Sequence, residues 1–258
     1  MSSKPSFSII VIAREGSAHL LPFTLASILE QDCPHFETIV VEEGTLGGEY
    51  PPGVRRVVSE RKSTFAMKNE ATSVAQGAYL HFLSPGEFYL SRHSLTFLAQ
   101  FIEENFYPDL VSSGTIVKHS FSAPEILFES MSPKRLKRGS IVPTLQPFFF
   151  RKEVLVGLGG FRTFYREQSG FDLLCRFFRA PSLRKAFFKR VLTDYEYRPT
   201  SAKKIIRSFA ETLVILFVHF GLSSALFAWL AKNQLRLFAW CWGGIKGAFR
   251  KRRPSEIF

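Results

Sequence analysis

The carboxyl ends of three predicted strands carry acidic residues. Glu15 lies two residues after the first strand, the pair Glu42-Glu43 ends the second, and Glu87 follows the third. Ligands of parallel α/β sheets bind beyond the carboxyl ends of the strands, so these side chains are candidates for ligand contact. Carboxylates can accept hydrogen bonds or take a proton. Lys68, in a predicted helix between the second and third of these strands, adds a cation that suits a phosphate group.

The elements that must position these residues alternate between strand and helix in the first ninety residues. Continuous apolar runs predict buried strands, and apolar residues at helical spacing predict helices. The helix before Gly77 is expected to end with this glycine as its C-cap. Alternation of this kind predicts a mainly parallel α/β sheet flanked by helices. The expected strands are Phe7–Ala13, Phe36–Val41, Val54–Val58 and Tyr79–Leu83, and the expected helices are Ala18–Gln31 and Thr64–Ala75.

The pattern is less regular from about Ser91 onward. Residues 118–146 are expected to form a basic loop that carries Lys134 to Arg138. The other expected elements are a helix over Ser91–Glu104, strands over Leu110–Val117 and Phe148–Arg151, a helix over Gly170–Arg179 and an edge strand over Val191–Tyr197.

Charge divides the chain into two parts. Residues 1–175 hold 17 Lys and Arg against 18 Asp and Glu, whereas residues 176–258 hold 17 against 4. The excess positive charge, +12 overall, therefore lies in the last third and suits an anionic partner. The three Cys residues are far apart and show no metal-ligand spacing, which indicates a reducing compartment.

The basic tail is also apolar and aromatic. We expect a domain over residues 1–200 and a membrane-associating helical tail over residues 201–258, which contains amphipathic or hydrophobic helices. Thr212–Ala231 is long enough to cross a bilayer, but Gly, Ser and His dilute it and basic residues flank both sides. Three arrangements are open: helices lying in the headgroup region, one transmembrane helix, or helices packed on the domain or in a dimer. Nucleic acid is not an expected partner, since no recognition motif is present.

Four segments, in order, resemble family 2 glycosyltransferases of the GT-A fold. They read FSIIVIAREG, FETIVVEEGT, AMKNEATSVAQGAYLHFLSPGEF and FFFRKEVLVGLGGF, and the resemblance extends from about Phe7 to Arg198. It implies a GT-A (Rossmann-like) fold and transfer of a sugar from a nucleotide-sugar donor. By the same resemblance, the donor contacts are expected from Ala13, Glu15, Glu42, Lys68 and Asn69.

Two motifs of that family are replaced in this chain. The DxD motif, which holds Mg²⁺ or Mn²⁺ against the diphosphate, falls on Ser84-Pro85-Gly86, and the ED motif, which carries the general base, falls on Ser169-Gly170. The resemblance therefore implies a divalent cation for which the ligands are absent, so no cofactor is assigned. Lys68, Arg14 and the loop 134–138 offer positive charge in its place.

For the general base, the nearby acids are Glu167 and Asp172, with Glu87 as a further candidate. Each candidate also has a structural alternative. Asp172 can serve as a cap or an ion-pair partner, Glu87 as an acid near a helix N-terminus, and Lys68 and Asn69 as exposed helix residues. The six His residues show no metal-binding spacing.

Two functions are compatible with these residues. The first is sugar transfer to a lipid-linked or cell-envelope glycan acceptor by a cytoplasmic protein attached to the anionic inner face of a membrane. The second is a catalytically inactive scaffold or regulator with the same fold. Loss of the carboxylates at Ser84, Gly86 and Gly170 favours the second function, whereas the retained Glu42 and Lys68 favour the first.

Overall fold

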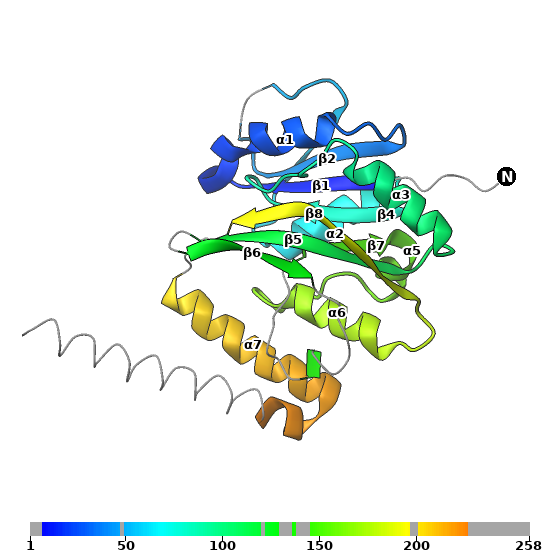
Figure 1. The fold of residues 1–258 in the computed structure, drawn as a ribbon. Helices are drawn as coiled ribbons and strands as arrows, with labels where there is room; N and C mark the ends of the chain where they lie inside the picture. Colours follow the sequence, from blue (N-terminus) through cyan, green and yellow to red (C-terminus); the bar gives the residue numbers. More distant parts are fainter. Residues whose placement is uncertain are drawn as a thin grey trace, which may run out of the picture.

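The structure is a computed structural model that describes residues 7–46, 49–119, 122–128, 136–137, 145–196 and 201–226. Its centre is one eight-stranded sheet with helices on both faces (Figure 1). The expected α/β class, with a mainly parallel sheet flanked by helices, is confirmed.

The amino-terminal half of the sheet is parallel. Its order is β3 (Val54–Ser59), β2 (Phe36–Glu43), β1 (Phe7–Ala13) and β4 (Tyr79–Leu83). Every residue of β1 is buried, because this strand lies inside the sheet and is covered on both faces. The continuous apolar sequence of β1 is therefore explained by its position.

The other half of the sheet is mostly antiparallel. The short strand β7 (Phe148–Arg151) pairs with β4 on one side and with β5 (Leu110–His119) on the other. Farther along, β5 pairs with β6 (Ser122–Phe128) and, on its opposite side, runs parallel to β8 (Lys185–Glu196). Pairing between β4 and β7 covers only Tyr79 to His81. The carboxyl end of β4 thus extends past β7, and this is the side on which a ligand cavity opens.

Two helical layers cover the sheet. The 3₁₀ turn η1 (Glu15–Leu20) leads into α1 (Leu21–Leu29), which shares one face with α3 (Ser94–Glu104). The other face carries α2 (Thr64–Val74), α5 (Lys152–Gly157) and α6 (Ser169–Arg179). Side chains alternate across a strand, and accordingly Ile9 and Val11 of β1 join the first core while Ile10 and Ile12 join the second.

The last described helix, α7 (Ala202–Phe220), packs on the outer side of α6 (Figure 1). Ile215 and Leu216 of α7 contact a small apolar cluster that includes Phe171 and Cys175 of α6. No helix among the described residues is long and apolar enough to cross a membrane. The described start of the basic tail therefore rests on the domain, whereas residues 227–258 and most of the loop 134–138 lie outside the described residues.

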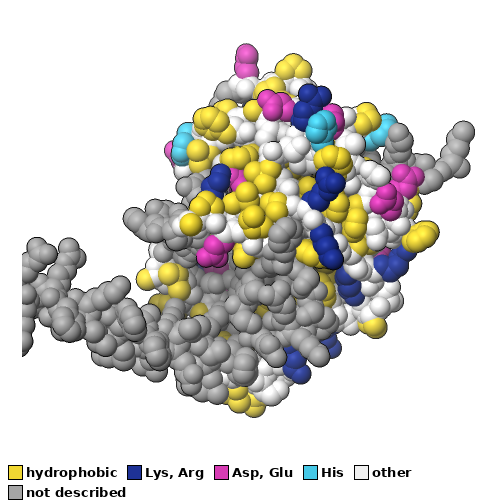
Figure 2. All heavy atoms as spheres, in the orientation of Figure 1, with side chains coloured by type: hydrophobic (Ala, Val, Ile, Leu, Met, Phe, Trp, Pro, Cys, Tyr) yellow, Lys and Arg dark blue, Asp and Glu magenta, His cyan; other side chains and the backbone are white. Residues whose placement is uncertain are grey.

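The surface drawn in Figure 2 is not uniformly polar. Hydrophobic side chains gather over the middle of this face, where Lys and Arg side chains lie among them. In β8, the guanidinium carbon of Arg190 lies 4.2 Å from the ring centroid of Phe97 in α3. Stacking of this kind covers apolar surface with a charged group.

Three sequence expectations are corrected. Residues 118–146 contain strand β6, and β8 begins at Lys185 because Lys185 and its successors pair with Leu110 to Ser112. Gly77 does not cap α2, which ends at Val74. A side chain at Gly77 would place its Cβ 2.5 Å from the backbone of Phe7, so close packing of the chain against β1 explains this glycine.

Candidate active site

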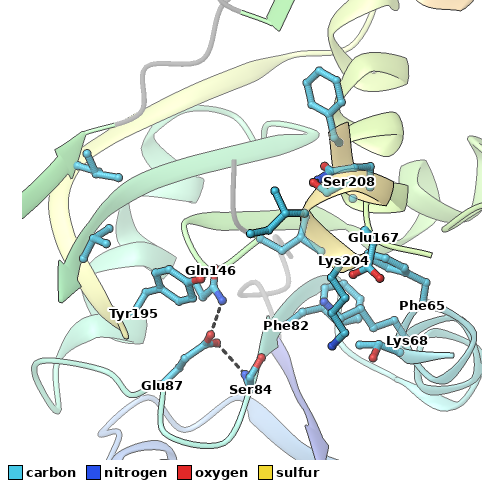
Figure 3. Close-up of a pocket in the computed structure, with 18 residues that line it drawn as sticks. Phe65, Lys68, Phe82, Ser84, Glu87, Gln146, Glu167, Tyr195, Lys204 and Ser208 are labelled. Carbon is cyan, nitrogen blue, oxygen red and sulfur yellow. Dashed lines mark hydrogen bonds between the residues drawn. The ribbon is translucent and has the colours of Figure 1, made fainter. Parts of the chain in front are cut away.

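A cavity of about 800 Å³ opens beside the carboxyl end of β4. Its walls come from α2, the segment after β4, the ends of β5, β6 and β8, the start of α6, and α7 (Figure 3). The cavity thus lies where ligands of α/β sheets bind. Its polar and charged lining residues are Thr64, Lys68, Ser84, Glu87, Gln146, Glu167, Gln168, Tyr195, Lys204 and Ser208.

Lys68 is the buried cation of this cavity. Its ammonium lies 5.3 Å from the ring centroid of Phe82, 5.6 Å from that of Phe65 and 5.7 Å from that of Phe161. Burial lowers the pKa of Lys68 to about 8, although the carboxylate of Glu87 acts in the opposite direction. The ammonium has no hydrogen bond or ion pair within the described part of the chain, so its charge is available to an anionic ligand.

Glu87 and Gln146 form a polar pair across the cavity from the aromatic wall (Figure 3). The carboxylate of Glu87 accepts a hydrogen bond from the Ser84 amide at 2.7 Å and another from Nε2 of Gln146. Oε1 of Gln146 is buried and has no hydrogen-bond partner among the residues that the structure describes. A buried acceptor that no described residue satisfies favours a ligand that donates a hydrogen bond to it.

His81 holds the backbone of Gln146 in place. Its ring lies between Tyr89 and the Gln146 carbonyl, with Nδ1 2.6 Å from the Tyr89 hydroxyl and Nε2 2.7 Å from the carbonyl oxygen. Complete burial lowers the pKa of His81 to about 4, so the ring is neutral at physiological pH. Neutral imidazole has one donor and one acceptor, which matches these two partners.

Helix α7 organises the wall of the cavity that carries Glu167. The Glu211 carboxylate of α7 accepts hydrogen bonds from the backbone amides of Arg166, Glu167 and Gln168, each at 2.9 Å. Glu211 therefore satisfies amides just before and at the start of α6, where a negative charge is favourable. The carboxylate of Glu167 lies 3.6 Å from the Arg207 guanidinium and is 23% exposed, so it can reach a ligand.

Asp172, the other predicted catalytic acid, is in a different environment. Its buried carboxylate contacts Arg176 at 2.9 Å, Arg162 at 3.3 Å and His219 at 2.8 Å. Burial alone would raise the pKa of Asp172, but His219 and the two guanidinium groups lower it below its usual value. Asp172 is not part of the cavity lining, and its contact with His219 joins α6 to α7.

The predicted nucleotide-contacting residues of β1 and β2 lie at the ends of neighbouring strands. Ala13 pairs in register with Glu42. The buried carboxylate of Glu42 accepts hydrogen bonds from Tyr50 and from Arg56, the latter at 2.7 and 3.0 Å. Burial opposes ionisation of Glu42, but these hydrogen bonds outweigh it and lower its pKa. Glu42 therefore already has internal partners.

The remaining predicted contacts differ in how accessible they are. Glu15 is exposed in η1. Asn69 holds a turn beside the cavity, since its side-chain amide donates to the Phe161 carbonyl at 2.7 Å and its Oδ1 accepts from the Phe161 amide at 2.8 Å. Glu43 is bonded to Arg14 and keeps 29% of its side chain exposed. Contact of any of these residues with a nucleotide stays a prediction.

The residues at the expected metal position do not fit a divalent cation. Gly86 has a φ of +93°, which side-chain-bearing residues rarely adopt, and its amide donates to Thr24 at 2.8 Å. The adjacent acid, Glu87, already accepts hydrogen bonds from Ser84 and Gln146. Within the described ranges, no group of three or more His, Cys, Asp or Glu is arranged to hold a metal ion. The cavity that contains Ser84 and Glu87 is also lined by the cationic side chains of Lys68 and Lys204.

The parallel strands, the antiparallel extension and the cavity at the carboxyl ends together define a GT-A-like fold. Solved structures similar to this chain include two of S. aureus TarS 1-349. The complex with UDP-GlcNAc has a TM-score of 0.66 at 16% identity and covers 86% of this chain and 69% of TarS 1-349. The complex with UDP has a TM-score of 0.64 at 17% identity over 86% and 68%.

Sequence comparison finds similarity to glycosyltransferases. No protein-family model matches the chain. The chain is similar to the "PGL/p-HBAD biosynthesis glycosyltransferase" of Mycobacterium tuberculosis and of Mycobacterium bovis. In each case 26% of 208 aligned residues are identical, over 74% of this chain and 77% of the relative.

Sequence reasoning identified Lys68, Glu87 and Glu167 as candidates, and the structure brings these three into one cavity. It did not identify Gln146, Lys204 or the α6 cap that α7 supplies. No local pattern marks Gln146 or Lys204, since each enters the cavity from an element distant in sequence. Asp172 was also considered as an ion-pair partner, and the partner Arg176, which was not named, could have been found from its spacing of four residues in a helix.

Proposed function

We propose that this chain is a family 2-type glycosyltransferase that moves a sugar from a nucleotide donor to a cell-envelope acceptor. The observation that carries the proposal is the buried ammonium of Lys68, which has no partner among the described residues, in a cavity at the carboxyl edge of the sheet. The resemblance to mycobacterial glycosyltransferases and the fold shared with the UDP-GlcNAc complex of TarS support it.

In the proposed reaction, a hydroxyl oxygen of the acceptor forms a bond to the anomeric carbon of the donor sugar. The bond from that carbon to the diphosphate breaks, and the nucleoside diphosphate leaves with the electron pair. The acceptor proton passes to the carboxylate of Glu167, which lines the cavity and is partly exposed. Asp172 is the weaker candidate, because two guanidinium groups and His219 already surround its carboxylate.

The nucleoside is proposed to lie beside the cavity, along the carboxyl ends of β1 and β2. Ala13 and Glu15 border this position, and the exposed Glu43 offers a carboxylate to the base. In this arrangement Glu42 acts through Tyr50 and Arg56, which it holds, rather than through direct contact. Asn69 likewise acts by fixing the turn at Phe161.

The acceptor is proposed to be lipid-linked or part of an envelope glycan, reached at an anionic membrane surface. Ile206, Val214, Phe217 and Val218 of α7 are each at least half exposed, whereas Ile215 and Leu216 face the domain. An apolar stripe beside basic residues suits attachment to the headgroup region. Sedimentation with vesicles tests this attachment: vesicles with anionic lipid are expected to bind the protein, and binding equal to that of neutral vesicles contradicts it.

A catalytically inactive scaffold of the same fold is the second candidate. The observation that favours it is the absence of carboxylates at Ser84, Gly86 and Gly170. A scaffold has no need for an unpaired buried ammonium, which is unfavourable without a ligand.

Donor binding and turnover separate the two functions. UDP-, GDP- and dTDP-linked sugars are titrated calorimetrically into the full chain, and envelope lipid extracts then serve as acceptors with the donor that binds. The glycosyltransferase proposal predicts that one donor binds and that sugar label enters the lipid fraction. A folded protein that binds none of these donors supports the scaffold.

A further inference from the structure

We infer that Lys68 of α2 and Lys204 of α7 form a two-lysine site for a diphosphate group, which takes the place of a divalent cation. The inference rests on the proposed function only in taking the diphosphate to be that of the donor. It adds a residue of α7 to the site and states which groups neutralise the leaving phosphate.

The first lysine is held in a position that favours an anion. The Lys68 side chain is only 9% exposed, and aromatic rings surround its ammonium. The nearby Glu87 carboxylate already accepts hydrogen bonds from Ser84 and Gln146. A desolvated charge of this kind gains more from an incoming opposite charge than a solvated one does.

The second lysine reaches the same cavity from the opposite wall. Figure 3 shows Lys204 extending from α7 toward the side on which Lys68 lies, and both residues line the cavity. The Lys204 amide donates to the capping Ser201 hydroxyl, so Lys204 lies in the first turn of α7. Its ammonium has no hydrogen bond or ion pair with any described residue.

The position of Lys204 is fixed by the rest of α7. Glu211 binds three amides at the start of α6, and Ile215 and Leu216 pack against α6. Lys203, next in sequence, is exposed as Lys204 is, but it does not line the cavity. The two lysines of α7 therefore differ in position although they carry the same charge, and Lys203 is a matched control.

A third group in the cavity favours a sugar diphosphate over a simple anion. Oε1 of Gln146 is a buried acceptor that has no partner in the described part of the chain, and Gln146 is 7% exposed. A phosphate oxygen cannot satisfy it, whereas a sugar hydroxyl can donate to it. Two cations and one free acceptor in a single cavity thus match a sugar attached to a diphosphate.

Calorimetric titration of the full chain with inorganic pyrophosphate in EDTA tests the two-lysine site. We expect binding without a divalent cation. Lys204→Gln is expected to weaken it about 10- to 100-fold, the range for loss of one charge-assisted contact. Lys203→Gln is expected to change the dissociation constant less than about twofold, because only general electrostatic attraction is lost. Lys68→Met is expected to weaken binding at least as much as Lys204→Gln, with thermal unfolding showing that it is folded.

Two results overturn the inference: pyrophosphate binding that requires Mg²⁺ or Mn²⁺, or equal losses in Lys203→Gln and Lys204→Gln. Its failure is distinguishable from failure of the proposed function. Sugar transfer that depends on a divalent cation supports the glycosyltransferase and rejects the two-lysine site. Pyrophosphate binding without binding of any nucleotide sugar supports the two-lysine site and rejects the proposal that a nucleotide sugar is its ligand.

Discussion

Replacing Lys68 with Met is expected to stabilise the ligand-free protein. Burial lowers the pKa of Lys68 from 10.5 to about 8, which corresponds to about 3.5 kcal/mol at about 1.4 kcal/mol per pH unit. Methionine retains an unbranched apolar side chain against Phe65, Phe82 and Phe161 and removes the charge. Since the cation–π contacts with these rings offset part of the burial penalty, the free energy of unfolding at pH 7 is expected to rise by about 1–3 kcal/mol.

The effect has a defined pH dependence. The folded-state pKa of Lys68 is below its unfolded value, so the unfolded chain binds more protons between pH 8 and 10.5. Lys68 therefore makes wild-type stability rise with pH across this window, and Lys68→Met lacks that contribution. The difference between the two proteins is expected to be largest below pH 8 and to shrink toward pH 10.5.

Urea unfolding followed by circular dichroism at pH 7 and pH 10 measures both quantities. Lys203→Met, at an exposed position, serves as the control and is expected to change stability by less than about 0.5 kcal/mol. If Lys68→Met instead lowers the free energy of unfolding at pH 7 by more than about 1 kcal/mol, the ammonium contributes to folding. The argument that it is kept for a ligand would then be refuted.

Three further substitutions distinguish catalysis from structure. Glu167→Gln is expected to lower turnover about 10²- to 10⁴-fold, because the general base is lost. Calorimetry is expected to give a donor affinity within about threefold of the wild-type value, and unchanged turnover excludes Glu167 as the base. Asp172→Asn is expected to lower the free energy of unfolding by about 3–5 kcal/mol in urea, because the buried guanidinium of Arg176 loses its counter-ion. A stable variant that has lost only turnover assigns catalysis to Asp172. Glu211→Ala is expected to cost about 1–3 kcal/mol by the same measurement, since the amides at the start of α6 lose their acceptor, and a change below about 0.5 kcal/mol contradicts the capping role.

The parallel half of the fold was predictable because buried strands can be identified from their runs of apolar residues. Strands β1 and β4 are mostly apolar, β2 contains the apolar run Ile39–Val41, and polar residues follow each of these stretches. Strand β6 was not predicted, since residues 123–126 are exposed and Pro124-Glu125 leaves an apolar run of only three residues. The start of β8 was also missed, because pairing with β5 rather than local pattern defines it.

The candidate site was predictable to a smaller extent. The position of the cavity follows from strand order, and Lys68 was found through a motif resemblance. Sequence could not show that Glu42 is bonded to Tyr50 and Arg56, because an acid at a strand end looks the same whether its partner is internal or a ligand. Capping of α6 by α7 could not be predicted from sequence either, since the hydrogen bonds of Glu211 join segments more than forty residues apart.

Calorimetric titration of the wild-type chain with UDP-, GDP- and dTDP-linked sugars, in EDTA and again in Mn²⁺, tests the central claim most directly. The account predicts that one donor binds in EDTA, that Mn²⁺ changes its affinity less than about twofold, and that Lys68→Met removes the binding. A folded protein that binds none of the donors under either condition would contradict the account.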